Sequence, residues 1–438
     1  MSRQSKKIST SRIQNGIYLY TTLIFLIVIT LIILVVDNLF EIGVTKYSTP
    51  YFITAIASII IIQALTWMIR NKGYKGIKHA LVHYSIVLNL RRAFLDSNYY
   101  NIRFRLNKKT ARLPRIKIEF EKGLSVGKLY IENIHMEKDI STSNISIALN
   151  RYVVERSYLS RDEKYYIFDI FDSNINRQLT FQSSDGLREH ALGSDEQHLF
   201  IDKFTSIPMH SSLFVGQTGS GKTYALYSLI LQMLLKKEKY NLYFVDPKNS
   251  SLSVVGEKVS SNNTASSFDK IIELLRRFNE LMDLRKIEIK NKLESQLEAT
   301  YADFGHSAHV LMFDEFASFQ TVLQSMEKKK RDEVMKLISQ VVLQGRQLGF
   351  FIWFVMQKSD SNQLPTYIRE NLPVKFVIGN AEKQTYVTAF GPGVDIKEKD
   401  FQLGEGLLVC PLIANQPKIC HFSYLDFNIL NAVEDLSE

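Results

Sequence analysis

Eight consecutive residues decide the fold: Gly216, Gln217, Thr218, Gly219, Ser220, Gly221, Lys222 and Thr223. They match the pattern G-x-x-x-x-G-K-[ST], follow an apolar stretch at Leu213 to Val215, and precede a helical pattern from Tyr224 to Leu235. In such a unit the backbone N–H groups of the loop surround phosphate groups at the start of the helix. We therefore expect a nucleotide-binding P-loop, in which Lys222 neutralises the β and γ phosphates of ATP and the Thr223 hydroxyl binds Mg²⁺.

A second acidic stretch lies further along the chain. An apolar run from His309 to Phe313 ends in Asp314 and Glu315. We expect Asp314 to hold Mg²⁺ through water, and Glu315 to orient and deprotonate the attacking water. Alone this pattern is weak, but downstream of a P-loop it is specific, because parallel sheets gather ligands at the carboxyl ends of their strands.

Further strands are predicted at Asn241 to Val245, Phe350 to Met356, Val374 to Ile378 and Gly406 to Cys410. Helical stretches separate these strands, an alternation that predicts an α/β fold with a mainly parallel sheet covered on both faces. The expected fold is a RecA-like P-loop motor. Gln357 follows one of the strands and is placed to sense the γ-phosphate; the alternative is a surface glutamine after a buried strand.

With 438 residues the chain is long enough for more than one domain. We expect a membrane anchor at 1–78, a small α+β middle domain at 79–200 and an ATPase motor domain at 201–438. The strands that predict the middle domain run from Arg115 to Phe120, Lys128 to Ile134 and Tyr165 to Phe171.

Two uncharged runs, 17–36 and 51–69, predict an N-terminal hairpin of two transmembrane helices. Lys and Arg flank the outer ends of both runs, so the positive-inside rule places both termini in the cytoplasm. The first run is longer than a signal peptide core and lacks a small-residue cleavage site. The expected localisation is the cell membrane, as a multi-pass protein with the membrane as a partner.

The net charge of +9 favours polyanionic partners such as nucleic acid or anionic lipid, although topogenic Lys and Arg would supply part of it. Basic residues gather between Asn101 and Lys117 and again from Lys328 to Arg331. Either group is able to contact phosphates or simply to be a solvated, charged surface. The two cysteines, Cys410 and Cys420, match no metal-ligand spacing and are expected to be reduced, partly buried thiols.

Four motifs occur in a fixed order: GQTGSGKT at 216–223, VDPK at 245–248, MFDEF at 312–316 and GRQLGF at 345–350. This order resembles the FtsK/SpoIIIE family of hexameric DNA translocases, and within it the shorter coupling ATPases of Gram-positive conjugative elements. The resemblance implies a homo-hexamer that uses ATP and Mg²⁺ to move DNA. It also implies that Arg346, and in the same way Arg369, serves a neighbouring subunit's nucleotide or the communication between subunits.

Two features depart from the family's pattern. The sequence ends at Glu438, soon after the expected motor, so we expect neither the C-terminal winged-helix domain of members that move chromosomes nor sequence-directed polarity. The family's Asp-Ser-Arg stretch reads Ala381-Glu382-Lys383-Gln384, so the role of that arginine is not transferred.

The expected function is a coupling ATPase that delivers DNA to a conjugative transfer channel, with a relaxase and mating-channel proteins as partners. A translocase that partitions chromosomes or plasmids is one alternative. Another is the ATPase of a protein secretion system, although a single P-loop disfavours it because tandem motor domains are expected in many of those ATPases. A scaffold that binds nucleotide without turnover is disfavoured because Glu315 is present.

Overall fold

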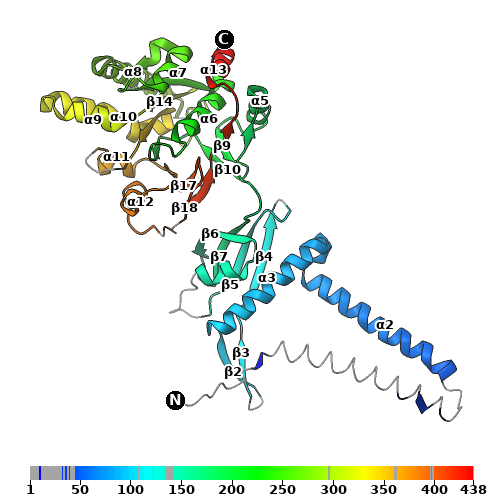
Figure 1. Cartoon of the computed structure of the whole chain (residues 1–438). Coiled ribbons are helices and arrows are strands. Elements are labelled where there is room, and N and C mark those ends of the chain that lie inside the picture. The colour runs from blue at the N-terminus through cyan, green and yellow to red at the C-terminus, as the bar shows by residue number, and fades with distance from the viewer. Residues whose placement is uncertain are drawn as a thin grey trace. The chain divides into compact units, whose positions relative to one another are not determined.

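The computed structural model describes residues 9–10, 32, 35–36, 39, 45–105, 108–121, 123–134, 142–293, 296–359, 363–394, 396 and 399–437. The chain divides into two compact units, Met1–Ile175 and Asn176–Glu438 (Figure 1).

The first unit contains a small antiparallel sheet with the strand order β4-β5-β7-β6. Its strands are β4 (Ile116–Glu121), β5 (Val126–Glu132), β6 (Tyr152–Leu159) and β7 (Tyr165–Asp172). Alternate residues of these strands, such as Ile118, Leu129 and Phe168, are buried with Leu90 of helix α3 (Ile77–Asp96). The strands predicted from the sequence at 115–120, 128–134 and 165–171 are therefore confirmed as β4, β5 and β7, whereas β6 was not predicted.

Helix α2 (Thr45–Arg70) precedes this sheet, followed by a 3₁₀ turn, Gly73–Lys75. The basic segment after α3 contains two antiparallel strands, β2 (Asn101–Arg105) and β3 (Lys108–Arg112). Strand β1 (Ser9–Thr10) pairs with β3, and a short helix, α4 (Thr142–Ala148), packs beside β6.

The prediction of a multi-pass membrane protein is contradicted, because no helix in the described part of the chain combines the length and apolar character needed to cross a bilayer. The second predicted span falls on α2, where Thr54, Ser58, Gln63 and Thr66 recur among the apolar residues. The first predicted span, 17–36, lies almost entirely outside the described residues.

The second unit is built on an eight-stranded sheet with the order β13-β12-β14-β15-β11-β16-β17-β18. The strands are β11 (Ser212–Val215), β12 (Tyr240–Val245), β13 (Thr264–Ala265), β14 (Ala308–Phe313), β15 (Phe350–Met356), β16 (Val374–Ile378), β17 (Glu405–Cys410) and β18 (Ala414–His421). All pairings from β13 to β16 are parallel, and β17 and β18 add antiparallel pairings at one side. The mainly parallel sheet expected from the sequence is confirmed.

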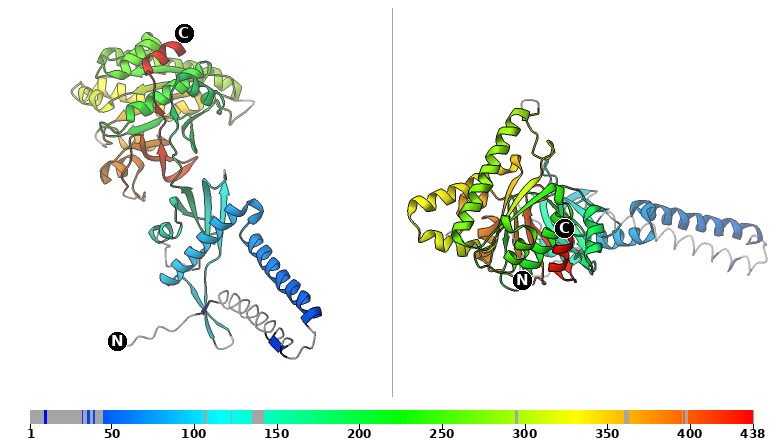
Figure 2. Two further views of the ribbon diagram at one scale, coloured as in Figure 1. Left: turned by 45° about the vertical axis from the view of Figure 1, so that its right-hand side comes forward. Right: turned by 90° about the horizontal axis from the view of Figure 1, so that it is seen from above.

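Helices cover both faces of this sheet (Figure 1). On one face α6 (Lys222–Leu235), α7 (Ser251–Ser260) and α13 (Ile429–Ser437) share a core with alternate strand residues such as Phe214 and Trp353. The other face is covered by α8 (Phe268–Leu293), α9 (Phe316–Gln324) and α10 (Lys328–Leu348). There Phe316 packs on Phe354, and Phe278 packs on Phe350. The far end of α8 and the α9–α10 hairpin project from the body of the unit (Figure 2).

Residues 176–200, which the sequence assigned to the middle domain, lie in the second unit. Strand β8 (Thr180–Phe181) pairs with β19 (Tyr424–Leu425), and α5 (Ser184–Leu192) leads to the hairpin of β9 (His198–Asp202) and β10 (Thr205–Pro208). The fully buried Gln232 amide bonds to both the N–H and the carbonyl of Phe200, each at 3.0 Å. These contacts over long sequence distances fix the segment on the second unit.

Both cysteines are unpaired and buried, Cys410 in β17 and Cys420 in β18, as expected. Burial raises the pKa of the Cys410 thiol, which favours its uncharged form.

Candidate nucleotide-binding site

The glycine-rich loop joins the central strand β11 to helix α6. Val215 is fully buried and pairs with Met356 of β15 and Val377 of β16, so the loop leaves the middle of the sheet. Gly219 and Gly221 have φ values of 83° and 91°, which side chains with a Cβ rarely adopt. A Cβ at Gly221 would also lie 2.8 Å from the backbone nitrogen of Gly404. The loop conformation therefore requires glycine at this position.

Lys222 and Thr223 form the first turn of α6. Thr223 is exposed, whereas Lys222 is only partly exposed. Burial lowers the pKa of Lys222, and the nearby carboxylates of Asp314 and Glu315 oppose that shift. Lys222 is therefore near enough to Asp314 and Glu315 for their charges to influence its pKa.

Asp314 and Glu315 follow β14, which lies between β12 and β15. The N–H of Asp314 donates to the carbonyl of Val245 at 2.8 Å, and its carboxylate accepts the N–H of Glu315 at 3.0 Å. Burial raises the pKa of Asp314, Lys222 counteracts this effect, and Asp246 adds to it. Glu315 has a left-handed backbone with φ 43°, a strained conformation for a residue other than glycine.

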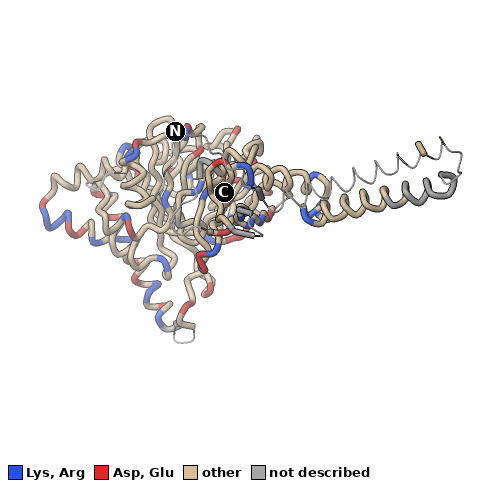
Figure 3. Tube along the Cα trace, turned by 90° about the horizontal axis from the view of Figure 1, so that it is seen from below, with Lys and Arg blue, Asp and Glu red and all other residues tan. Residues whose placement is uncertain are grey.

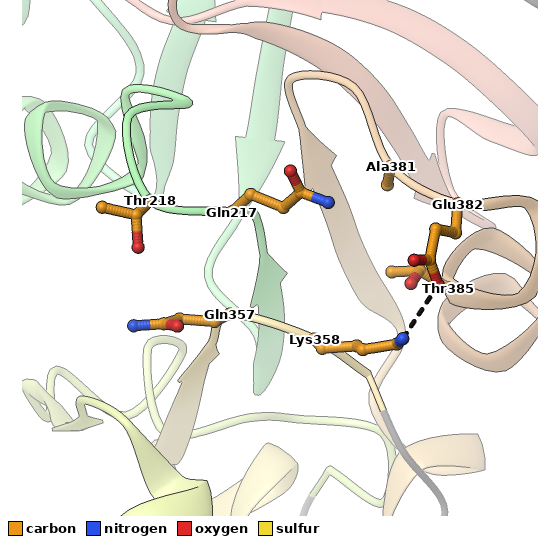
Figure 4. Close-up of a pocket in the computed structure, with 7 residues that line it drawn as sticks. All are labelled: Gln217, Thr218, Gln357, Lys358, Ala381, Glu382 and Thr385. Atoms are coloured by element: carbon orange, nitrogen blue, oxygen red, sulfur yellow. Dashed lines mark hydrogen bonds and ion pairs between the residues drawn. The ribbon is translucent and has the colours of Figure 1, made fainter.

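Gln357 follows β15 and lines a cavity of about 390 Å³ with the loop residues Gln217 and Thr218 (Figure 4). Lys358 and Glu382 also line the cavity and form an ion pair at 2.8 Å. The structure therefore brings Gln357 beside the P-loop, at the carboxyl edge of the sheet.

Arg346 lies at the opposite edge. It is an exposed residue in the last turn of α10, which ends just before β15 begins. Burial lowers the pKa of His210, and the charge of Arg346 lowers it further. His210 lies just before the start of β11. Arg346 is thus not brought together with Lys222 and Glu315 in one chain. Arg369 sits on the short helix α11 (Thr366–Glu370), where it donates to the Thr366 hydroxyl at 3.2 Å.

Lys248 also lies at this site, although no role was predicted for it from the sequence. Its Nζ lies 3.4 Å from Glu315 Oε2, while its motif partner Asp246 is fully buried. The VDPK motif was the available signal, but the side-chain contact depends on β12 and β14 being neighbours in the sheet.

The residues present fit a nucleotide with a divalent cation. Burial disfavours the charged forms of both Lys222 and Asp314. Phosphate oxygens would stabilise the charged Lys222, and a divalent cation would stabilise the charged Asp314. The loop glycines and the start of α6 supply backbone N–H groups for phosphates.

Residues 174–343 match the model of the FtsK/SpoIIIE family. The FtsK domain-containing protein YdcQ of Bacillus subtilis is 28% identical over 179 residues, covering 41% of this chain and 36% of the relative. The DNA translocase FtsK of Vibrio vulnificus is 22% identical over 304 residues, covering 60% of this chain and 29% of the relative. The matched part therefore spans about a third of each relative's length.

Two solved structures are similar at lower levels. The pCW3 conjugation coupling protein TcpA with ATPγS has a TM-score of 0.48 at 16% identity, covering 80% of this chain and 99% of that chain. ATPases 2 and 3 of EssC from Geobacillus thermodenitrificans have a TM-score of 0.45 at 15% identity, covering 60% and 51%. The P-loop and the acidic pair Asp314 and Glu315 lie within residues 174–343, so the part of the chain that carries the candidate site is similar to the FtsK/SpoIIIE family.

Proposed function

We propose that the chain hydrolyses ATP and uses the energy to translocate DNA. The observation that carries the proposal is the convergence of Lys222, Asp314, Glu315 and Gln357 at the carboxyl edge of the sheet in an FtsK/SpoIIIE domain. Relatives of this domain bear the name DNA translocase, which supports DNA as the substrate.

The residues divide the chemistry between them. The P-loop and Lys222 bind the phosphates, and Thr223 and Asp314 would hold Mg²⁺, which supplies charge neutralisation when bound. Glu315 accepts the proton of the attacking water, and Gln357 contacts the γ-phosphate side of the site. The proposal also includes a hexamer. Arg346, at the opposite edge of the sheet, would act on the nucleotide of a neighbouring subunit and not on its own.

The first turn of α10 is the surface we assign to DNA. Lys328 and Lys329 are exposed and have no ion pair within the described part of the chain, whereas Lys330 lies 3.6 Å from Asp269. Near the tip of the projecting α9–α10 hairpin, segments of Lys and Arg alternate with segments of Asp and Glu (Figure 3). These cations oppose the helix dipole at the start of α10, a cost that phosphate groups would remove.

We propose more narrowly that the chain delivers DNA to a conjugative transfer channel, with a relaxase and channel proteins as its partners. Transfer frequency in a strain that carries Lys222→Ala tests it: loss of transfer with normal growth supports the role, and normal transfer contradicts it. A defect in chromosome or plasmid partitioning would favour the alternative translocase.

Two substitutions in the full chain test the enzymatic part. Lys222→Ala should weaken ATP binding and abolish turnover, because the phosphates lose their cation. Glu315→Gln should keep ATP binding but reduce turnover by roughly 10²- to 10⁴-fold, the usual contribution of a general base. A fully active Glu315→Gln protein would remove Glu315 from its assigned role. Lys239→Ala, at an exposed pair with Glu196, is the control and should leave both properties unchanged.

A further inference from the structure

The turn after β12 is held in place by hydrogen bonds to one carboxylate, that of Asp246. Asp246 is fully buried and accepts hydrogen bonds from the N–H groups of Lys248, Ser250 and Ser253 and from the Ser250 hydroxyl, at 2.7 to 3.1 Å. Its own N–H donates to the carbonyl of Ala265 at 3.1 Å. The backbone that carries Lys248 is therefore fixed, and only the lysine side chain retains freedom.

The backbone of Glu315 is equally fixed. Phe313 and Phe316, on either side of the acidic pair, are fully buried and pack edge to face with ring centroids 5.0 Å apart. Between them the chain turns through the left-handed conformation of Glu315, which becomes the residue before α9. Since Val245 pairs with Phe313, the two turns emerge side by side from adjacent strands.

Across these turns Lys248 Nζ lies 3.4 Å from Glu315 Oε2. The Glu315 side chain is 12% exposed, and that of Lys248 is 47% exposed. An ion pair with one half-exposed partner stabilises a fold only weakly, so stability alone does not explain why Lys248 and Glu315 form this pair. It does select one orientation for a carboxylate that would otherwise sample several rotamers.

We propose that Lys248 is a positioning residue for Glu315, holding its carboxylate in the orientation in which it receives the proton of the attacking water. The inference rests on the proposed ATPase function. Lys248 takes no proton itself, and nucleotide affinity remains with the P-loop and Lys222. Misplacing a catalytic group by about 1 Å costs roughly 100-fold in rate, so loss of this pair should lower turnover and leave ATP binding intact.

Steady-state ATP hydrolysis by full-length Lys248→Met and Lys248→Arg proteins tests the proposal. Lys248→Met should lower kcat by roughly 10- to 100-fold with KM changed by less than about threefold, and Lys248→Arg should recover most of the rate. The matched control is Lys258→Met, which removes another lysine of this region from its pair with Glu434 and should not change kcat. An unchanged or increased kcat in Lys248→Met, or a KM that rises as much as kcat falls, overturns the proposal.

The same substitution in a Glu315→Gln background separates positioning from an independent role. Because Lys248 acts through the carboxylate, Lys248→Met should add no further loss to the single-turnover rate of Glu315→Gln. The inference is overturned if Lys248→Met lowers the rate of the Glu315→Gln protein by as large a factor as it lowers the rate of the wild type. A wild-type protein without ATP hydrolysis would refute the proposed function itself, whereas an active wild type with an unaffected Lys248→Met variant refutes only the role of Lys248.

Discussion

The backbone N–H of Gly404 donates to the carbonyl of Ser220 at 3.0 Å, which ties the loop before β17 to the P-loop. A second contact holds the same region, because the N–H of Gly379 donates to the carbonyl of Glu405 at 2.7 Å. The P-loop is thus supported from behind by the antiparallel end of the sheet, and its shape does not depend on the local sequence alone.

Gly221→Ala should weaken ATP binding by about tenfold or more. The substitution places a Cβ at φ 91° and 2.8 Å from the Gly404 nitrogen, so the loop must shift away from its support. Titration with a fluorescent ATP analogue measures the effect. Gly186→Ala, where no atom lies nearer than 3.7 Å, is the control, and equal affinities of the two variants would contradict the account.

Gly345→Ala should destabilise the second unit by about 2 kcal/mol or more, because a Cβ there would lie 2.0 Å from the carbonyl oxygen of Phe350. Urea unfolding followed by far-ultraviolet circular dichroism measures the change. Gly193→Ala is the matched control, since its Cβ would meet nothing nearer than 3.4 Å. If the two variants unfold at the same midpoint, the close approach of α10 and β15 is not as described.

Acidification should destabilise the motor through His309. Burial and then the charge of Arg285 lower the pKa of His309 from 6.5 to about 3. Between these values the unfolded chain holds a proton that the folded chain does not, so stability is fully present above the unfolded pKa and falls as pH falls. His309→Gln should reduce the pH slope of the unfolding free energy by about one proton below pH 6.5. An unchanged slope would show that His309 is not held neutral.

Lys328→Ala/Lys329→Ala should lower the affinity for DNA and reduce the slope of log affinity against log salt by about two. Fluorescence anisotropy with a labelled duplex at several salt concentrations measures both quantities. The matched double variant Lys239→Ala/Lys258→Ala removes two lysines that pair with Glu196 and Glu434 instead. Equal slopes for the two double variants would place DNA on another surface.

Much of the motor fold follows from local sequence. Phe350–Met356 and Val374–Ile378 form strands with the predicted bounds, because a run of large apolar residues between turns is typical of a strand buried on both faces. The P-loop was equally evident, since its glycines and Lys222 have a chemical reason to occur at that spacing.

Properties that depend on distant parts of the chain were not predictable in this way. The Lys248–Glu315 pair requires β12 and β14 to be neighbours, which a single sequence does not report. Residues 176–200 join the motor through pairing of β8 with β19, far away in the chain. The prediction of two transmembrane helices is contradicted, because no helix in the described part of the chain is long and apolar enough to cross a membrane.

ATP hydrolysis of the full chain, measured with and without double-stranded and single-stranded DNA at two salt concentrations, tests whether the protein is a DNA motor. At least one form of DNA should stimulate hydrolysis, and the stimulation should fade at higher salt, because the contacts are to phosphates. Hydrolysis that neither form of DNA stimulates at either salt concentration would contradict a DNA motor.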